Sequence, residues 1–257
     1  MKLGLVVALK AEARALLGRG RWASAGGRKV KSVSLPGGDE LITVISGVGK
    51  QKALSAAQWL VETAPGALLS LGLAGGVNPE VKPGDVVIAE KVIEEGKGPV
   101  WRADGLVVGS ACEALKSSSL RVRSGAVVTT SLPALSVEDK KTIYMRDHAL
   151  AVDMESAAVA KAAELAGLPL FVMRAVSDGP GQSISREIFD CLDEEGGVNP
   201  GAFLRNTLKR PAMLQEAFGL RKGFNAGLSS LATAWETLVQ KRFYALFAQG
   251  REKSAER

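Results

Sequence analysis

The chain has 257 residues, of which 46% are hydrophobic and 23% charged, proportions typical of a soluble globular protein with one large domain or two small ones. Two cysteines and a single histidine, His148, argue against a disulfide framework, a histidine-based metal site and a Ser-His-Asp triad. No secretory signal opens the sequence, and no uncharged apolar stretch reaches the roughly 18 residues of a membrane-spanning helix, so we expect a cytoplasmic protein.

The net charge of +6 is carried by the C-terminal part of the chain. From Arg205 onward there are ten Lys or Arg and four Glu, whereas residues 1–204 carry 23 residues of each sign. A neutral body without interleaved basic and aromatic residues argues against nucleic-acid binding. We therefore predict an α/β domain at 1–204 and a basic helical extension at 205–257, packed on that domain.

Short apolar runs alternate with helical stretches, which predicts an α/β fold with a largely buried sheet. An alanine-rich stretch at 156–166 is typical of a helix, and Gly167 suits a left-handed position at its end. The predicted strands are 3–8, 30–35, 41–46, 67–71, 86–95, 126–130, 149–152 and 169–176, and the predicted helices are 11–17, about 50–62, 137–146 and 156–166.

Two glycine-rich segments, Gly47-Val48-Gly49 and 72–76, follow predicted strands and are expected to form turns. Glycine there allows positive φ and a close approach of the backbone to a ligand. Neither segment has the spacing of a Walker A loop or of GxGxxG, so a nucleotide triphosphate or dinucleotide is disfavoured.

Carboxylates stand where two predicted strands end. Asp153 and Glu155 follow 149–152, and Asp178 follows 169–176. Ligands of open α/β sheets bind outside the carboxyl ends of the strands, so these acids are candidates for one shared cleft. The alternative is structural, because acids are stabilised at helix starts and Asp is common in turns.

From residue 202 onward the sequence is typical of helix, with breaks expected near Pro211 and at 219–227. Its apolar positions recur at helical spacing. They favour a helix packed on the domain or on a second subunit, or alternatively a basic amphipathic helix on an anionic membrane surface. These positions are Leu228, Leu231, Ala234, Trp235, Leu238 and Val239.

Five motifs in one order, LGLVVALKAEARAL, ISGVGKQKA, LGLAGGVNPEVKPGDVVIAE, VDMESAAVA and RAVSD, span about residues 1–180. Together they resemble the nucleoside phosphorylase superfamily, and within it the branch of 5′-methylthioadenosine/S-adenosylhomocysteine nucleosidases. RAVSDGP and the later LKRPAMLQEAF resemble the hopanoid-associated phosphorylases, which are implicated in removing adenine from adenosylhopane. The resemblance implies a three-layer α/β/α fold with a central mixed sheet and a helical C-terminal extension, and a homo-oligomer, commonly a dimer.

The same resemblance implies roles for three acids. Glu12 would help activate the attacking water, Glu155 would bind the ribose hydroxyls, and Asp178 would protonate the departing purine. The residues expected to bind the substrate are Ala74, Gly75, Met154, Arg174 and Ser177. The segment TTSLPALS departs from the family, since it has no ring to stack on adenine, and Phe189 is a candidate replacement.

These roles suit cleavage of an N-ribosyl bond, whose transition state carries positive charge on the sugar. A carboxylate at the ribose stabilises that charge, and a purine leaves readily only when protonated. Asp178 can supply the proton only if burial holds its carboxyl group protonated. The attacking group, water or phosphate as co-substrate, is left open, and no metal or organic cofactor is called for. A non-catalytic nucleoside-binding protein is the alternative from another class.

Overall fold

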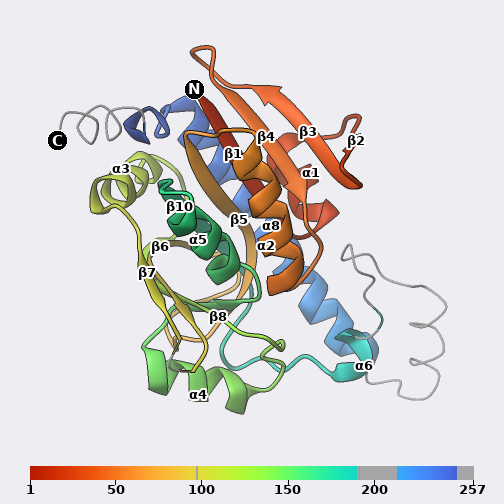
Figure 1. The fold of residues 1–257 in the computed structure, drawn as a ribbon. Helices are drawn as coiled ribbons and strands as arrows, with labels where there is room; N and C mark the ends of the chain where they lie inside the picture. Colours follow the sequence, from red (N-terminus) through yellow and green to blue (C-terminus); the bar gives the residue numbers. More distant parts are fainter. Residues whose placement is uncertain (97, 190, 192–212, 248–257) are drawn as a thin grey trace.

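The computed structural model describes residues 1–96, 98–189, 191 and 213–247 (Figure 1). Within them, ten strands form one mixed sheet flanked by helices. The strands are β1 (Lys2–Val7), β2 (Ala23–Ala25), β3 (Arg28–Ser34), β4 (Glu40–Ile45), β5 (Ala67–Gly76), β6 (Val86–Glu94), β7 (Val100–Arg102), β8 (Val122–Thr129), β9 (Ala151–Asp153) and β10 (Leu170–Asp178). The helices are α1 (Lys10–Leu17), α2 (Lys50–Glu62), α3 (Gly105–Leu115), α4 (Val137–Asp147), α5 (Ser156–Leu165), α6 (Arg186–Phe189) and α8 (Met213–Gln240).

The sheet curls back on itself around β5. Strand β5 is parallel to β1 on one side and to β10 on the other, and its last two residues also pair with the short strand β9. Because β10 continues to β6, β6 to β8 and β8 to β9, the strands β5, β10, β6, β8 and β9 close a ring. The carboxyl ends of β5, β9 and β10 therefore meet in one place.

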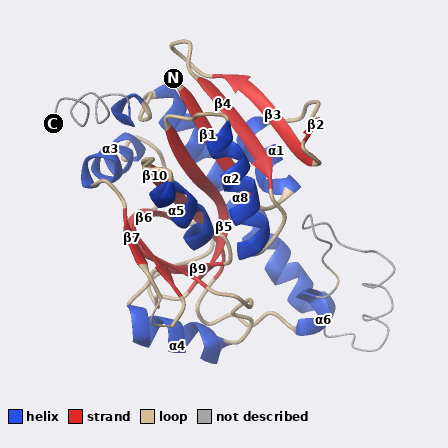
Figure 2. Ribbon diagram, in the orientation of Figure 1, coloured by secondary structure: helices blue, strands red, loops and turns tan. Residues whose placement is uncertain are grey.

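Side chains alternate between the two faces of the sheet, as the period of a strand requires. Leu3 and Leu5 of β1 pack with α1, α3 and α8, whereas Val6 packs with α2 and α5. The result is the three-layer α/β/α arrangement that the resemblance implied, with α2 and α5 on one face and α8 behind the sheet (Figure 2). The mixed α/β fold class is confirmed.

The prediction that residues 72–76 form a turn is wrong, because β5 continues through Gly76. The glycines are needed for space within the strand rather than for a turn. A Cβ at Gly72 would lie 2.7 Å from Oε1 of Glu12, and one at Gly75 would lie 3.2 Å from Oδ2 of Asp178. By contrast, Gly47 and Gly49 do have positive φ, and Gly49 immediately precedes α2, as expected of a turn.

The predicted helix break at 219–227 is also wrong, since α8 is continuous from Met213 to Gln240. Its glycines permit close packing against β10. A Cβ at Gly223 would lie 2.1 Å from the carbonyl oxygen of Ser177, and one at Gly227 would lie 3.1 Å from that of Val176. Tertiary packing here outweighs the low helix propensity of glycine.

The apolar face of α8 is buried inside the protein. Leu231, Ala234, Trp235 and Leu238 belong to the main hydrophobic core, so α8 packs against the sheet and the neighbouring helices. The boundary predicted at 204/205 and the break near Pro211 lie outside the described residues. None of the described helices is both long enough and apolar enough to cross a membrane.

Candidate active site

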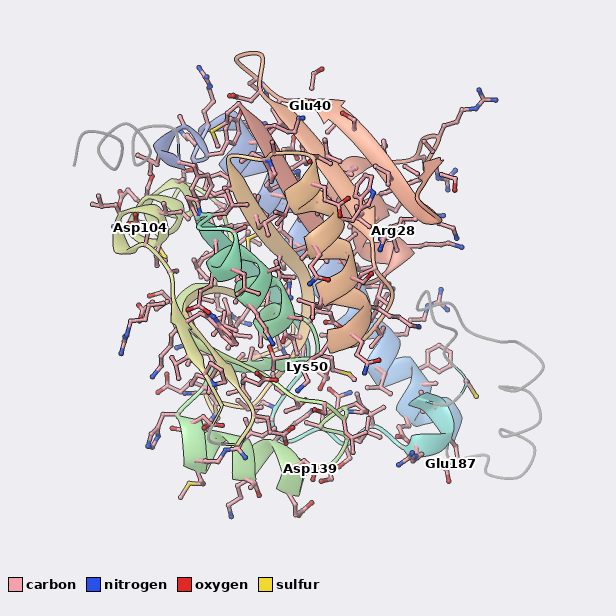
Figure 3. All side chains as sticks on the ribbon, in the orientation of Figure 1. Arg28, Glu40, Lys50, Asp104, Asp139 and Glu187 are labelled. Atoms are coloured by element: carbon pink, nitrogen blue, oxygen red, sulfur yellow. The ribbon has the colours of Figure 1, made fainter. Side chains whose placement is uncertain are left out.

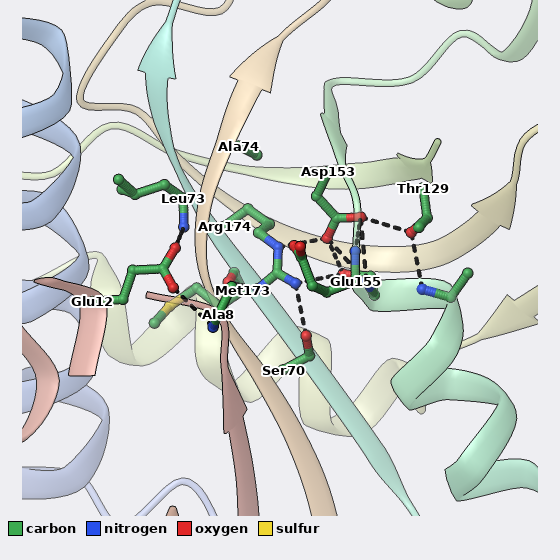
Figure 4. Close-up of polar contacts among 12 residues, drawn as sticks. Ala8, Glu12, Ser70, Leu73, Ala74, Thr129, Asp153, Glu155, Met173 and Arg174 are labelled. Atoms are coloured by element: carbon green, nitrogen blue, oxygen red, sulfur yellow. Dashed lines mark hydrogen bonds and ion pairs between the residues drawn. The ribbon is translucent and has the colours of Figure 1, made fainter. Parts of the chain in front are cut away.

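Glu12 lies in the first turn of α1, under the end of β5. Its Oε2 accepts hydrogen bonds from the backbone N–H groups of Ala8 (3.0 Å) and Leu9 (2.8 Å). Its Oε1 accepts one from the N–H of Leu73 in β5 (2.7 Å; Figure 4). Burial raises the pKa of Glu12, although these hydrogen bonds and the positive charge of Arg174 oppose the shift.

Glu155 lies between β9 and α5 and is 8% exposed. Its Oε1 accepts a hydrogen bond from the backbone N–H of Gly49, at the start of α2 (2.8 Å). Burial, reinforced by the neighbouring charge of Asp153, raises the pKa of Glu155 to about 7, while Arg174 and the Gly49 hydrogen bond act in the opposite direction. Glu12, Glu155 and Arg174 line one small hollow between side chains, which is too narrow to hold a water molecule in this structure.

Asp153 is the centre of a buried hydrogen-bond network (Figure 4). Its carboxylate accepts from Thr129 Oγ1 (2.6 Å), from Arg174 Nε (2.7 Å), and from the N–H and hydroxyl groups of Ser156. Asp153 therefore accepts hydrogen bonds at the start of α5, as its position in the sequence indicated, and it also binds the guanidinium of Arg174.

Arg174 points inward from β10 and is 2% exposed. Besides the ion pair with Asp153, its Nη2 donates to Ser70 Oγ (2.7 Å) and Ser156 Oγ (2.9 Å). The guanidinium is thus committed to Asp153, Ser70 and Ser156, and its positive charge opposes the rise in the pKa of both glutamates.

Asp178 ends β10, beside Gly75 of β5, and is 6% exposed. Its Oδ1 accepts a hydrogen bond from the hydroxyl of Ser177 (2.6 Å). Its Oδ2 accepts one from Nζ of Lys140, a lysine of α4 with no exposed surface. The same ammonium donates to the carbonyl oxygens of Gly179 (2.9 Å) and Gln182 (2.7 Å).

Strand β5 connects these carboxylates. Leu73 donates to Glu12, and Gly75 lies between Val152 of β9 and Asp178 of β10. The structure thus brings the predicted acids to the end of one strand, Glu12 and Glu155 around the hollow and Asp178 beyond Gly75.

The remaining predicted residues lie close by. Ala74 and Gly75 are in β5 itself, and Ser177 directly precedes the acid and also donates to the carbonyl oxygen of Ala74 (3.2 Å). Met154 is half-buried beside Glu155. Phe189 ends α6, but its side chain is outside the described part of the structure. In TTSLPALS, Leu132 is 76% exposed.

Lys140 and the role of Asp153 were missed by sequence reasoning. The only signal for Lys140 was a lysine in an otherwise polar helix, and a solvent-exposed position is the ordinary interpretation of such a residue. Asp153 precedes a helix, where an acid is stabilised in any case.

Comparison with known proteins identifies the family of the chain. The family model described as "Phosphorylase superfamily" matches residues 2–209. A 5′-methylthioadenosine/S-adenosylhomocysteine nucleosidase of Oceanobacillus iheyensis is 28% identical over 188 residues, covering 66% of this chain and 81% of the relative. The corresponding nucleosidase of Chromohalobacter salexigens is 29% identical over 207 residues, covering 72% of this chain and 82% of the relative.

Solved structures share the fold. A variant of the Helicobacter pylori nucleosidase of this type, with 5′-methylthioadenosine in its active site, has a TM-score of 0.72 at 16% identity, covering 93% of this chain and 98% of that one. Futalosine hydrolase of the same organism has a TM-score of 0.72 at 17% identity, covering 94% and 98%.

The fold and the relatives define an enzyme of the class that comprises nucleoside phosphorylases and nucleosidases. The chain belongs to the phosphorylase superfamily, in its methylthioadenosine/S-adenosylhomocysteine nucleosidase-like branch.

Proposed function

We propose that the enzyme hydrolyses the N-ribosyl bond of an adenosyl-type purine nucleoside, releasing the purine and a free sugar. One observation carries the proposal: two buried glutamates without an ionic partner among the described residues face one hollow, and a third buried acid lies just beyond Gly75. The relatives named above, which are nucleosidases, support the same reaction.

Glu155 is assigned to the sugar. Its carboxylate, held by the Gly49 N–H, would accept hydrogen bonds from the ribose hydroxyls and stabilise the positive charge that develops on the ring. Because the pKa of Glu155 is about 7, its carboxyl group is only partly ionised in the resting enzyme at neutral pH. Positive charge developing on the ribose would favour the ionised form.

Glu12 is assigned to the water. Three backbone N–H groups hold its carboxylate in one orientation, and burial raises its pKa towards the operating pH, where a general base is most effective. Glycoside hydrolases use a similar arrangement, in which one carboxyl group acts as the acid and the other as the base on either side of the glycosidic bond. Here the acid would be Asp178.

The other site residues would shape the substrate pocket. Ala74 and Gly75 offer β5 backbone to the nucleoside, Met154 packs against the ribose, and Ser177 orients Asp178 through its hydroxyl. We assign Arg174 a supporting role, because its guanidinium binds Asp153, Ser70 and Ser156.

Phosphorolysis is the second candidate reaction, since the superfamily includes phosphorylases. Phosphate would then replace water as the attacking group, and no cofactor is proposed for either route. Hydrolysis is favoured because Glu12 provides a base for water, which phosphate does not need.

The group on the ribose 5′ carbon is the finer question. The relatives are named for methylthioadenosine and S-adenosylhomocysteine, whereas RAVSDGP and LKRPAMLQEAF resemble enzymes of adenosylhopane.

Since the apolar face of α8 is buried, a peripheral membrane contact would depend on exposed basic residues such as Arg221, Lys222 and Lys241. We also propose a homodimer.

The test is purine release from 5′-methylthioadenosine, S-adenosylhomocysteine and adenosine, measured with and without phosphate. Hydrolysis predicts release without phosphate and a free sugar as the second product. Strict dependence on phosphate with a sugar 1-phosphate product would replace hydrolysis by phosphorolysis. Tight nucleoside binding without release would contradict both.

A further inference from the structure

Lys140 presents a question that the proposed reaction leaves open. Asp178 must give a proton to the purine, yet its Oδ2 accepts a hydrogen bond from the buried ammonium of Lys140, and the two side chains form an ion pair of ammonium and carboxylate. A carboxylate has no proton to give. The proton for the leaving purine must therefore come from a second group.

The hydrogen bonds of Lys140 identify that group. An ammonium has three N–H donors, and here they meet three acceptors: Asp178 Oδ2 and the carbonyl oxygens of Gly179 and Gln182. A neutral amine would keep two N–H donors for the two carbonyls and turn its lone pair to Asp178. The site is thus satisfied in both protonation states of the lysine.

Only one of the three protons is able to move. The two carbonyl oxygens are not bases at ordinary pH, whereas the carboxylate of Asp178 is. Lys140 has no exposed surface, whereas Asp178 is 6% exposed, so in this proposal the lysine exchanges its proton through Asp178. Lys140 lies in α4. The start of this helix is stabilised by a capping box of Ser136 and Asp139, and Asp139 is labelled in Figure 3.

We infer that Lys140 stores the proton that Asp178 passes to the departing purine, which makes it a positioning and proton-supplying residue of this site. The inference rests on the proposed function. As the bond between the sugar C1′ and the purine nitrogen breaks, its electron pair stays with the purine. One proton moves from Nζ of Lys140 to Asp178 and then from Asp178 to a purine nitrogen, so that Asp178 carries it only in transit.

The protons balance over the full reaction. Lys140 is left as a neutral amine and Asp178 as a carboxylate, while the attacking water gives its hydroxide to C1′ and its proton to Glu12. Once the products leave, Glu12 returns its proton to solvent, and Lys140 regains one through Asp178. The net reaction is nucleoside plus water to purine plus sugar.

The variants Lys140→Met and Lys140→Arg test the inference. Methionine removes the proton, and arginine keeps the charge but does not release its proton in proteins. Lys141→Met, at the exposed neighbouring position of α4, is the matched control. Thermal melting of each variant verifies that it is folded.

Two substrates are compared, adenosine and 4-nitrophenyl β-D-ribofuranoside, whose nitrophenolate departs without a proton. We expect both Lys140 variants to lose about 100-fold in kcat on adenosine, at the lower end of general-acid effects, and less than about threefold on the nitrophenyl riboside. Rescue by arginine, equal losses on both substrates, or no loss on adenosine would overturn the inference. Wild-type enzyme inactive on both substrates would instead refute the proposed function, and the inference with it.

Discussion

The two halves of the proposed site use the same kind of side chain in opposite electrostatic settings. In the half that we assign to the sugar, Glu12 and Glu155 are buried and bound by backbone N–H groups, and burial raises the pKa of both. In the half that we assign to the base, Asp178 is paired with the ammonium of Lys140. Strand β5 separates the halves by a few residues, with Leu73 bound to Glu12 and Gly75 beside Asp178.

The difference shows that the effect of burial on an acid depends on whether a cation lies beside it. A buried acid without an ionic partner holds its proton more strongly and is poised to act as a base or to meet a cation. A buried acid beside an ammonium needs the ammonium to deliver a proton.

The largest effect is expected for Glu12→Gln. A glutamine cannot take a proton from water, so turnover of a purine nucleoside should fall about 10²–10⁴-fold. Initial rates of purine release measure this. Glu90→Gln, at an exposed position in β6, should stay within about twofold of wild type. If Glu12→Gln retained most activity, water activation would have to come from another group.

Asp178→Asn tests the pairing in the base half. The substitution leaves the ammonium of Lys140 buried without a carboxylate, which typically costs about 3–5 kcal/mol. Urea unfolding should show this loss of unfolding free energy in the single variant Asp178→Asn. The loss should be smaller in the double variant that also carries Lys140→Met. Additive losses of the two single variants would mean that the pair contributes nothing as a pair.

Adding one methyl group to β5 probes each half in turn. The Cβ of Gly72→Ala would lie 2.7 Å from Glu12 Oε1, so the carboxylate has to move, and a displacement of about 1 Å costs on the order of 100-fold in kcat. The Cβ of Gly75→Ala would lie 3.2 Å from Asp178 Oδ2, which needs a smaller shift and should cost about tenfold at most. Steady-state kinetics at matched stability distinguish the two, and the reverse order would contradict the geometry.

The smallest effect should have the opposite sign. The folded-state pKa of Glu155, about 7, exceeds its ordinary value of 4.5, so wild type loses stability as pH rises through this interval. Glu155→Gln removes the penalty while its side-chain oxygen still accepts from Gly49. Urea unfolding should find the variant more stable by on the order of 1–3 kcal/mol at pH 8.5 and nearly equal at pH 4.5. A variant less stable at pH 8.5 would mean that the ionised carboxylate stabilises the fold.

The α/β fold and most element positions could be predicted from the sequence, because hydrophobic patterns and helix ends are local signals. The three acids were named from motifs, and the structure brings them to the end of β5, but their roles stay predictions. Residues 72–76 and α8 were misjudged for one shared reason. Glycine was taken as a signal for turns or breaks, whereas here it makes room for Glu12 and for close packing of α8 on β10.

Lys140 was beyond the reach of sequence reasoning for a different reason. Its partner Asp178 is 38 residues away, and the contact exists only because α4 and the end of β10 meet in the folded chain. No local pattern distinguishes a lysine buried in this way from an exposed one such as Lys141.

The most direct test is a crystal structure of Asp178→Asn with a bound purine nucleoside. The account predicts the ribose hydroxyls within hydrogen-bonding distance of Glu155, the purine beside residue 178, and C1′ facing Glu12. A nucleoside bound in the reverse direction, with its base against Glu155, would contradict the division of the cleft into a sugar half and a base half.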